Sequence, residues 1–341
     1  MKRLLLRVSV AAICMLLVAG AWAWHTVTAF MRTAPESPGR DITIRVRPGA
    51  SFAQVARQLA EHGLVSDARK FHLLARYRQQ TGVIQAGEFL FNTGWTPDIV
   101  LNELVYGMPV QHRLHFPEGL PWWEVARILE REGFARSEDV NAVVHDPVFL
   151  REHGIPFDSA EGFLFPETYR MDKPEAMTPE TARIVVGRLV DMFWRKTGVL
   201  WPQGRPDPEE LRRLVILATL VEKETSVPEE RAIVAGVYAN RMRLGMLMQA
   251  DPTIIYGIGP GFDGNITRAD LRNATNPYNT YTRRGLPPGP ICSPGVEALR
   301  AALNPAPHKF LYFVAKGDGT HHFSKTLPEH NAAVRRYQLR R

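Results

Sequence analysis

The first hydrophobic feature of the chain is an uncharged run near its N-terminus. No charged residue occurs from Val8 to Met31, whereas residues 1–7 carry three basic residues and no acidic one. As a helix rising about 1.5 Å per residue, this run would be about 36 Å long, enough to cross the hydrocarbon core of a bilayer. Positive charge at its start predicts that residues 1–7 stay in the cytoplasm and that the chain after Met31 lies outside it.

A cleaved signal peptide is the alternative for this segment, because Ala19-Gly20-Ala21 loosely fits a small-residue cleavage site. The bulky Trp22 and Trp24 and the length of the run instead favour an uncleaved anchor over residues 8–31, with the tryptophans at a membrane interface. Residues 32–40 contain two prolines and a glycine and predict a short polar linker. No later segment is apolar enough to span a membrane, so the sequence predicts a single-pass protein.

A strand pattern and then a helical pattern follow the linker. Ile44 and Val46 alternate with arginines, as on a strand, and Pro48-Gly49 predicts a turn. Apolar residues then recur at i, i+3, i+4, i+7 and i+8, which predicts an amphipathic helix. They are Phe52, Val55, Ala56, Leu59 and Ala60. A second helix over Asp67–Gln79 and a strand over Ala86–Phe91 complete the order strand, helix, helix, strand.

That order and size resemble a LysM module, a small fold that binds glycans containing N-acetylglucosamine. The resemblance implies glycan binding by residues 41–107. A structural spacer with no ligand is the alternative, because many small domains share so simple an order.

A second copy of this module is predicted downstream. EVARILEREG (Glu124–Gly133) repeats QVARQLAEHG (Gln54–Gly63), with Val, Ala, Arg, Leu and Gly in matching places. Farther on, Phe163-Leu164-Phe165 echoes Phe89-Leu90-Phe91. We therefore predict a diverged second module over residues 112–171. Two copies indicate paired modules and not a solenoid, which needs at least three units.

Two helices are predicted in the C-terminal part, which begins after the Pro- and Gly-rich loop Pro202–Pro208. Apolar residues at helical spacing mark the first helix, and Pro228 is expected to start the second, Glu229–Arg243, which Gly245 ends. The core residues expected in these helices are Leu211, Leu214, Val215, Ala218, Val221, Val234, Val237, Tyr238 and Met242.

The first of these helices ends in Glu222-Lys223-Glu224-Thr225. Residues two apart on a helix lie about 200° apart, so the two glutamates cannot share a face. Both flank apolar positions, and periodicity alone does not choose between them. An exposed helix end is the plain interpretation. A glutamate held against apolar side chains would instead have a raised pKa, which suits a general acid at neutral pH.

Four blocks of sequence are similar to the YceG-like family, the endolytic murein transglycosylases. They are Leu220–Gly259, which begins LVEKETSVPEER, Asn276–Ala306, Tyr312–Asn331 and EGFLFPETYRM (Glu161–Met171). Together with the anchor and the LysM-like module, the resemblance covers nearly the whole chain. In that family the catalytic acid is the second glutamate of the E-K-E-T motif, so the resemblance implies that Glu224 is catalytic.

The implied reaction is cleavage of MurNAc-β-1,4-GlcNAc bonds within peptidoglycan strands. Most glycosidases use two carboxylates, one of which supplies a nucleophile or activates a water. A lytic transglycosylase can omit the second, because the C6 hydroxyl of MurNAc closes on C1 and leaves a 1,6-anhydro end. The enzyme is then a lyase, and the resemblance implies no cofactor and points to termination of strands made by peptidoglycan synthases.

Polar residues in these blocks are the candidate sugar-binding residues. Amides and hydroxyls hydrogen-bond to sugar hydroxyls, and tyrosines stack on sugar faces. The candidates are Glu222, Gln249, Asp251, Thr253, Tyr256, Tyr278, Asn279, Thr280 and Tyr281. Loop capping or packing is the alternative for each of them.

The composition of the chain limits which kinds of disulfide and metal site it can contain. The chain has 341 residues, 45% of them hydrophobic and 23% charged, as in globular proteins, and only Cys14 and Cys292 as cysteines. A disulfide framework and a Cys-based zinc site are therefore excluded. His321, His322 and His330 lack metal-ligand spacing, so we expect no metal. A non-catalytic wall-binding scaffold remains an alternative to the enzyme.

Charge and topology complete the expectations. The net charge of +7 suits a polyanion, but a location outside the cytoplasm argues against nucleic acid. We expect an α+β protein in the cytoplasmic (inner) membrane, with a mixed α/β catalytic domain in the periplasm and a core that is lysozyme-like. The expected segments after the linker are 41–107, 108–207 and 208–341.

Overall fold

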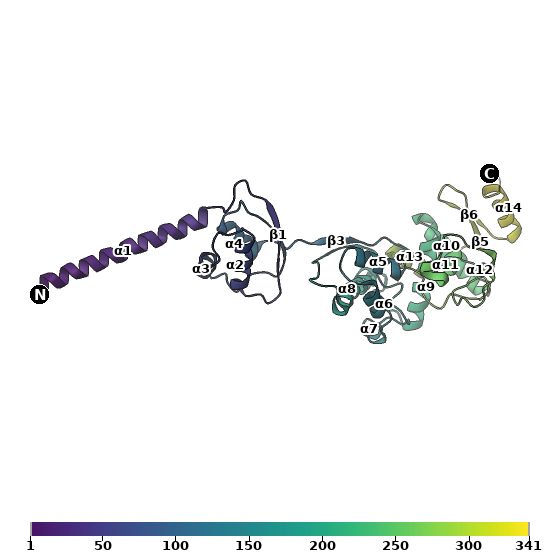
Figure 1. The fold of residues 1–341 in the computed structure, drawn as a ribbon. Coiled ribbons are helices and arrows are strands. Elements are labelled where there is room, and N and C mark those ends of the chain that lie inside the picture. The colour runs from purple at the N-terminus through teal and green to yellow at the C-terminus, as the bar shows by residue number, and fades with distance from the viewer. Residues whose placement is uncertain (1, 340–341) are drawn as a thin grey trace. The chain divides into compact units, whose positions relative to one another are not determined.

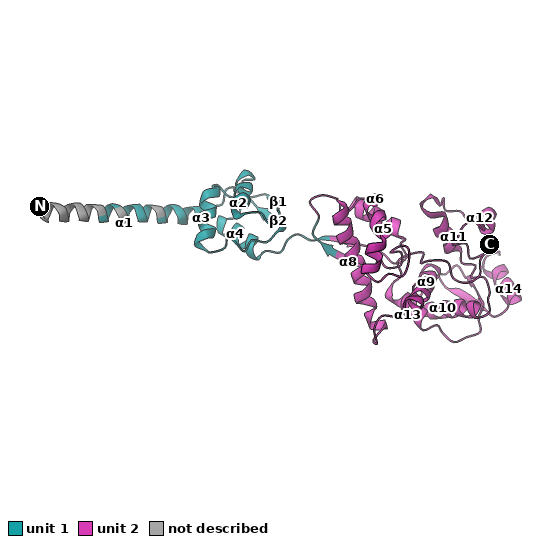
Figure 2. Cartoon of the chain, turned by 90° about the horizontal axis from the view of Figure 1, so that it is seen from below, with its two compact units in different colours: residues 1–112, 170–173 teal, residues 113–169, 174–341 magenta. Residues whose placement is uncertain are grey.

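The computed structural model describes residues 2–339, with side chains from Ile13 onward except those of Leu16 and Ala23. The chain divides into two compact units, which Figure 2 colours separately. The first comprises residues 1–112 and 170–173, and the second comprises residues 113–169 and 174–341. The expected segments 108–207 and 208–341 thus lie mostly in one unit.

The first unit has the strand, helix, helix, strand order that periodicity predicts, followed by one more helix. Its elements are α1 (Lys2–Arg32), β1 (Asp41–Val46), α2 (Phe52–Glu61), α3 (Ala68–Tyr77), β2 (Gly87–Asn92) and α4 (Pro97–Tyr106) (Figure 1). The two strands pair antiparallel, from Asp41 opposite Asn92 to Val46 opposite Gly87. Within the described residues, α1 is the one helix apolar and long enough to cross a membrane, over Ile13–Arg32.

One hydrophobic core holds this unit together. Ser51 begins α2 by accepting the backbone N–H of Gln54, whose side chain accepts the N–H of Ser51 in return, a capping box. The apolar stripe of α2 is buried against α3 and the two strands, as predicted. Phe30, in the last turn of α1, is only 7% exposed and belongs to the same core. The end of α1 is therefore part of the module and not a free tether.

The region predicted as a second module repeats the element order with one helix added. It contains β3 (His112–His115), α5 (Trp122–Arg131), α6 (Ser137–Val144), α7 (Pro147–Glu152) and β4 (Thr168–Met171). The two strands pair in a two-stranded sheet. The echo at Phe163-Leu164-Phe165 is not a strand, because these buried residues lie at the end of a turn and in the loop after it, and the strand starts at Thr168. Duplication stays a prediction.

Helices dominate the rest of the second unit. They are α8 (Pro179–Thr197), α9 (Pro208–Glu224), α10 (Pro228–Arg243), α11 (Asp251–Ile258), α12 (Arg268–Arg272), α13 (Val296–Leu303) and α14 (Leu327–Tyr337), with short 3-10 turns at Gly198–Leu200 and Gly259–Gly261. The strands β5 (Tyr312–Ala315) and β6 (His321–Ser324) form an antiparallel pair. The described residues thus have a mixed α/β fold, and a lysozyme-like core stays a prediction.

The helix α9 lies at the centre of this unit and packs against α10, α11 and α13 (Figure 1). Every residue from Leu214 to Val221 is buried, so α9 is enclosed by protein on all sides over two turns, and only Thr219 among these residues is polar. The predicted core residues Val234, Val237 and Tyr238 of α10 are buried as well. A central buried helix fixes the position of whatever side chain stands at its end.

Candidate active site

Glu224 is the last residue of α9. The helix ends there because Thr225 adopts an extended backbone, with φ −145° and ψ 133°, and Pro228 begins α10 three residues later. The side chain of Glu224 is half-buried, at the junction of the buried helix and a cleft. A carboxyl group in this place is surrounded by protein atoms and is still accessible to a ligand.

Burial and one hydrogen bond have the largest effects on the pKa of this carboxyl. Burial raises the pKa of Glu224 from 4.5 to about 7, and the hydroxyl of Tyr238 on α10, which donates to Oε1 over 3.0 Å, opposes that rise. Asp251 raises the pKa further through its negative charge. Burial also raises the pKa of Tyr238, so its hydroxyl stays protonated and remains a donor. At neutral pH, Glu224 can therefore both release and accept a proton.

The cleft beside Glu224 has a volume of about 400 Å³ and a polar, aromatic lining. Four residues singled out from the sequence meet there: Glu224, Gln249, Asp251 and Tyr281. The other lining residues are Arg241, Met248, Tyr312, Phe313, Leu327, His330 and Asn331. Such a lining can hold sugar hydroxyls with amides and carboxylates and sugar faces with rings.

Asp251 and Tyr281 are hydrogen-bonded to each other in this cleft. The Tyr281 hydroxyl donates to Oδ1 of Asp251 over 2.5 Å, which ties α11 to the loop after α12. Gln249, just before α11, has a positive φ of 50°, a conformation that is uncommon for a residue other than glycine. Its N–H donates to the carbonyl of Thr280, so that loop also holds Gln249 in place.

Thr253, Thr280 and Asn279 do not line this cleft, and each is at most 2% exposed. The two threonine hydroxyls are 3.0 Å apart, and that of Thr280 accepts the N–H of Ala250. The amide of Asn279 donates to three backbone carbonyls between residues 270 and 273. The structure therefore gives these three residues a supporting position, with their hydrogen-bonding groups used inside the protein.

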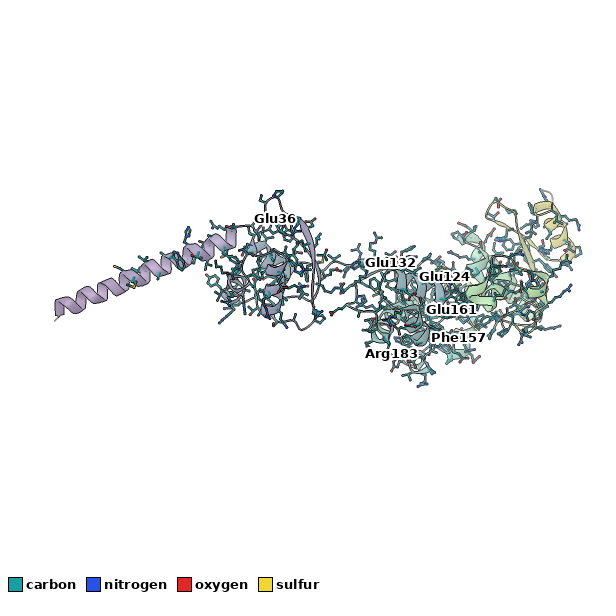
Figure 3. The ribbon with its side chains drawn as sticks, in the orientation of Figure 1. Glu36, Glu124, Glu132, Phe157, Glu161 and Arg183 are labelled. Carbon is teal, nitrogen blue, oxygen red and sulfur yellow. The ribbon has the colours of Figure 1, made fainter. Side chains whose placement is uncertain are left out.

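Tyr256 and Tyr278 belong to a neighbouring aromatic cluster and do not line this cleft. Their ring centroids are 4.7 Å apart, and Tyr256 lies 5.0 Å from Trp123. Glu161, labelled in Figure 3, is fully buried there and accepts the N–H of Trp122 over 3.0 Å. Burial raises the pKa of Glu161 to about 7, against hydrogen bonds from backbone N–H groups and from Tyr256.

Glu222 does not enter the cleft with Glu224. Its carboxylate accepts the N–H of Gly295, the residue that precedes α13, over 2.9 Å. Burial raises the pKa of Glu222 as well, and its contact at the N-terminus of α13 is favourable for a carboxylate. The helical period therefore separates the two glutamates, as their spacing predicts, and Glu224 is the one that lines the cleft.

Sequence reasoning missed three groups that build the site. Tyr238 was expected only as a core residue of α10, and nothing in its spacing indicates its hydroxyl contact with Glu224. Arg241 is 7% exposed and donates to the carbonyls of Leu311 and Met248, each over 2.7 Å. A charged residue within a core face was the one signal that could have drawn attention to it.

Glu230 and His321 form the third of these groups. The carboxylate of Glu230 accepts the N–H of His321 over 2.8 Å and lies 2.7 Å from its Nδ1, and it also accepts the hydroxyl of Thr225. The pair joins β6 to the start of α10, next to the end of α9. The three histidines that cluster in the sequence have different partners: besides the contact of His321 with Glu230, His330 stacks on Tyr312, and the ring of His322 is tilted against that of Tyr337. Among the residues described, no group of three or more His, Cys, Asp or Glu side chains could hold a metal ion.

Glu224 thus combines a near-neutral pKa, a hydrogen bond from Tyr238 and access to a polar cleft, a combination that suits general acid–base catalysis. The model of the YceG-like family matches residues 44–336, which is most of the chain. The protein therefore belongs to the YceG-like family.

Characterised relatives and a solved structure agree with this assignment. The chain is 27% identical over 311 residues to the endolytic murein transglycosylase of Bacillus subtilis, covering 87% of this chain and 84% of that one. It is also 27% identical to the enzyme of the same name from Streptococcus pneumoniae strain R6. That alignment covers 86% of this chain and 58% of the relative. A yceG-like protein from Listeria monocytogenes has a similar structure, with a TM-score of 0.54 and 26% identity over 86% of this chain and 99% of that one.

Proposed function

We propose that this protein is an endolytic murein transglycosylase that cleaves MurNAc-β-1,4-GlcNAc bonds within peptidoglycan strands. The observation that carries the proposal is the half-buried Glu224, whose carboxyl has a pKa near 7 and opens on the cleft. A glycosidic oxygen leaves only when it is protonated, and this carboxyl supplies the proton at neutral pH. The scaffold alternative leaves this arrangement without a use.

The proposed reaction needs one carboxyl and no water. Protonated Glu224 gives its proton to the oxygen of the GlcNAc leaving group as the bond to C1 of MurNAc breaks. The C6 hydroxyl of the same MurNAc then bonds to C1, and its proton passes to the Glu224 carboxylate. The products are a GlcNAc end with a free hydroxyl and a 1,6-anhydro-MurNAc end, and Glu224 is again protonated.

The residues around Glu224 have separate parts in this scheme. Tyr238 donates to Oε1 and thereby directs the transferable proton to Oε2. Gln249, Asp251 and Tyr281 line the cleft where the sugar rings would lie, and the aromatic side chains of Tyr312 and Phe313 form part of its wall. No cofactor is needed, since acid–base transfer and the substrate's own hydroxyl account for every bond.

Mass spectrometry of muropeptides tests the proposal. Purified sacculi digested by the protein should yield fragments from inside the strands that end in 1,6-anhydro-MurNAc, each one water lighter than the hydrolysed product. A reducing end carrying ¹⁸O from labelled water would instead identify a hydrolase, with Asp251 as the first candidate for the second carboxylate. The absence of any cleavage would favour the alternative of a non-catalytic wall-binding scaffold.

We also propose that α1 is retained as a single-pass anchor in the cytoplasmic (inner) membrane, with residues 32–341 in the periplasm. The uncharged sequence after the basic N-terminus supports it, as does the burial of Phe30 in the core of the first unit. Protease added to spheroplasts should degrade most of the protein. Full protection, or a mature N-terminus near Trp22, would contradict the anchor. In that location the natural substrates are strands emerging from peptidoglycan synthases.

Glycan binding by residues 41–107 is a further part of the proposal. A pocket of about 490 Å³ lies at the turn between β1 and α2, lined by Arg45, Arg47, Gln54 and Gln58 among others. Amides suit the hydroxyls and acetamido groups of a sugar, and arginines suit the carboxylates of its peptide stems.

Replacing Arg47 with alanine should weaken binding of the full chain to sacculi about tenfold, the loss of one charge-assisted contact. Arg57, another exposed arginine, on α2 outside the pocket, is the matched control, and its replacement should leave binding unchanged. Co-sedimentation with sacculi measures both. Equal effects of the two substitutions would favour the spacer interpretation.

A further inference from the structure

A groove of about 680 Å³ runs between the end of α1 and α3. The side of α1 contributes Gly20, Trp24, Val27, Thr28, Phe30, Met31 and Arg32, and α3 contributes Lys70, Leu73, Leu74 and Tyr77. Most of this lining is apolar. Thr28 adds no free polar group, because its hydroxyl donates to the carbonyl of Trp24 within α1.

The side chains of α3 at this groove are unusually exposed for apolar residues. Leu73 is 60% exposed and Tyr77 is 78% exposed. They lie four residues apart on one face of α3, and Lys70 extends the same face. Arg69 and Arg76 are exposed beside it, so the face combines apolar and aromatic groups with positive charge. This composition is typical of helices that lie in a membrane interface.

The length of α1 places this groove at the membrane surface. The helix has 31 residues and is therefore about 46 Å long, whereas the hydrocarbon core is about 30 Å thick. If the basic N-terminus stays in the cytoplasm, about 20 residues, from Val8 to about Val27, cross the core, and Trp22 and Trp24 lie within about 8 Å of its far side, close to the interface where tryptophan is favoured. The last turns of α1 then lie among the headgroups. Since Phe30 fixes these turns in the core of the module, α3 lies in the same layer.

We propose that the face formed by Lys70, Leu73 and Tyr77 docks on the lipid of the bilayer that α1 spans. Leu73 and Tyr77 enter the boundary between headgroups and acyl chains, and Lys70, Arg69 and Arg76 contact anionic headgroups such as phosphatidylglycerol. Lipid is the occupant because one wall of the groove is the membrane-spanning helix itself. The inference rests on the proposed anchor, and it makes the first module a membrane-bound base instead of a tethered domain.

Depth-dependent fluorescence quenching tests this proposal on the full chain. The protein is reconstituted in vesicles of phosphatidylethanolamine and phosphatidylglycerol, with a polarity-sensitive dye on one cysteine at a time. In a Cys14→Ser background, Leu73→Cys carries the dye, and Cys292 stays unlabelled because it is fully buried. Leu90→Cys is the matched control, since Leu90 is a 48% exposed leucine of β2 outside the groove.

The dye at position 73 should emit at shorter wavelength than at position 90 and be quenched by lipids that carry a nitroxide near the headgroup. Equal, water-like signals at both positions would overturn the docking face. A shifted signal at 73 without quenching by lipid would mean that a second copy of the chain covers it, which also overturns the proposal. The native Cys14, labelled in the otherwise unaltered chain, reports separately on the anchor. If Cys14 is quenched and position 73 is not, the anchor stands and only the docking face fails.

Discussion

Replacing Glu224 with glutamine is expected to remove the 1,6-anhydro product while leaving the protein folded. Glutamine keeps the size of the side chain and can still accept the Tyr238 hydroxyl, but it has no proton to transfer. General acid–base catalysis contributes about 10²–10⁴-fold to a rate, and in the proposed reaction one carboxyl serves both proton transfers, so we expect a loss at the upper end. Muropeptide mass spectrometry measures the loss.

Glu222→Gln is the matched control for this substitution. Its carboxylate contacts the N–H of Gly295 and not the cleft, so we expect most of the activity to remain and stability to fall by about 0.5–2 kcal/mol, as for a weakened helix cap. An active Glu224→Gln beside an inactive Glu222→Gln would reverse our assignment of the two faces of α9.

The folding of Glu224→Gln can be checked through its stability. The pKa of Glu224 is about 7 in the folded protein and near 4.5 without burial, so the folded state binds the proton more tightly. Stability from this group is therefore fully present below about pH 4.5 and is lost as the pH rises to 7. Glutamine cannot ionise, so at pH 7 the variant should melt no lower than the wild type.

Tyr238→Phe is expected to lower the rate about tenfold. It should also move the alkaline limb of the pH–rate profile, where the rate falls with rising pH, to higher pH. The wild-type rate should fall above pH 7, because Glu224 must be protonated to act as an acid and its pKa is about 7. The Tyr238 hydroxyl stabilises the ionised carboxylate, and a hydrogen bond to a charged group contributes about 1.5–3 kcal/mol. Loss of this hydrogen bond should raise the pKa of Glu224 by about one to two units.

A pH–rate profile of kcat/KM with a soluble glycan strand measures this shift. Tyr169→Phe is the matched control, because the hydroxyl of Tyr169 is also buried and donates to the carbonyl of Phe165 over 2.7 Å, with no contact to Glu224. That variant should lose stability and keep the wild-type limb. An unmoved alkaline limb in Tyr238→Phe would show that the hydroxyl does not act on the carboxyl proposed to be catalytic.

Local sequence determined the elements of this protein well where one periodicity dominated. The alternation at Ile44 and Val46 and the stripe from Phe52 to Leu59 produced β1 and α2 close to the expected bounds, because one buried face decides each element. The echo at Phe163-Leu164-Phe165 was misleading. Its three large side chains are buried at the end of a turn and in the loop after it, where packing and not strand pairing holds them.

The sequence by itself also determined that Glu222 and Glu224 point to different sides of α9, since the helical period allows nothing else. Only the tertiary structure decided which side is the cleft. That choice depends on Tyr238, Asp251 and Gly295, residues from elements that the chain brings together over long separations. The raised pKa of Glu224 has the same origin, because desolvation is a property of the packed environment and is absent from any local pattern.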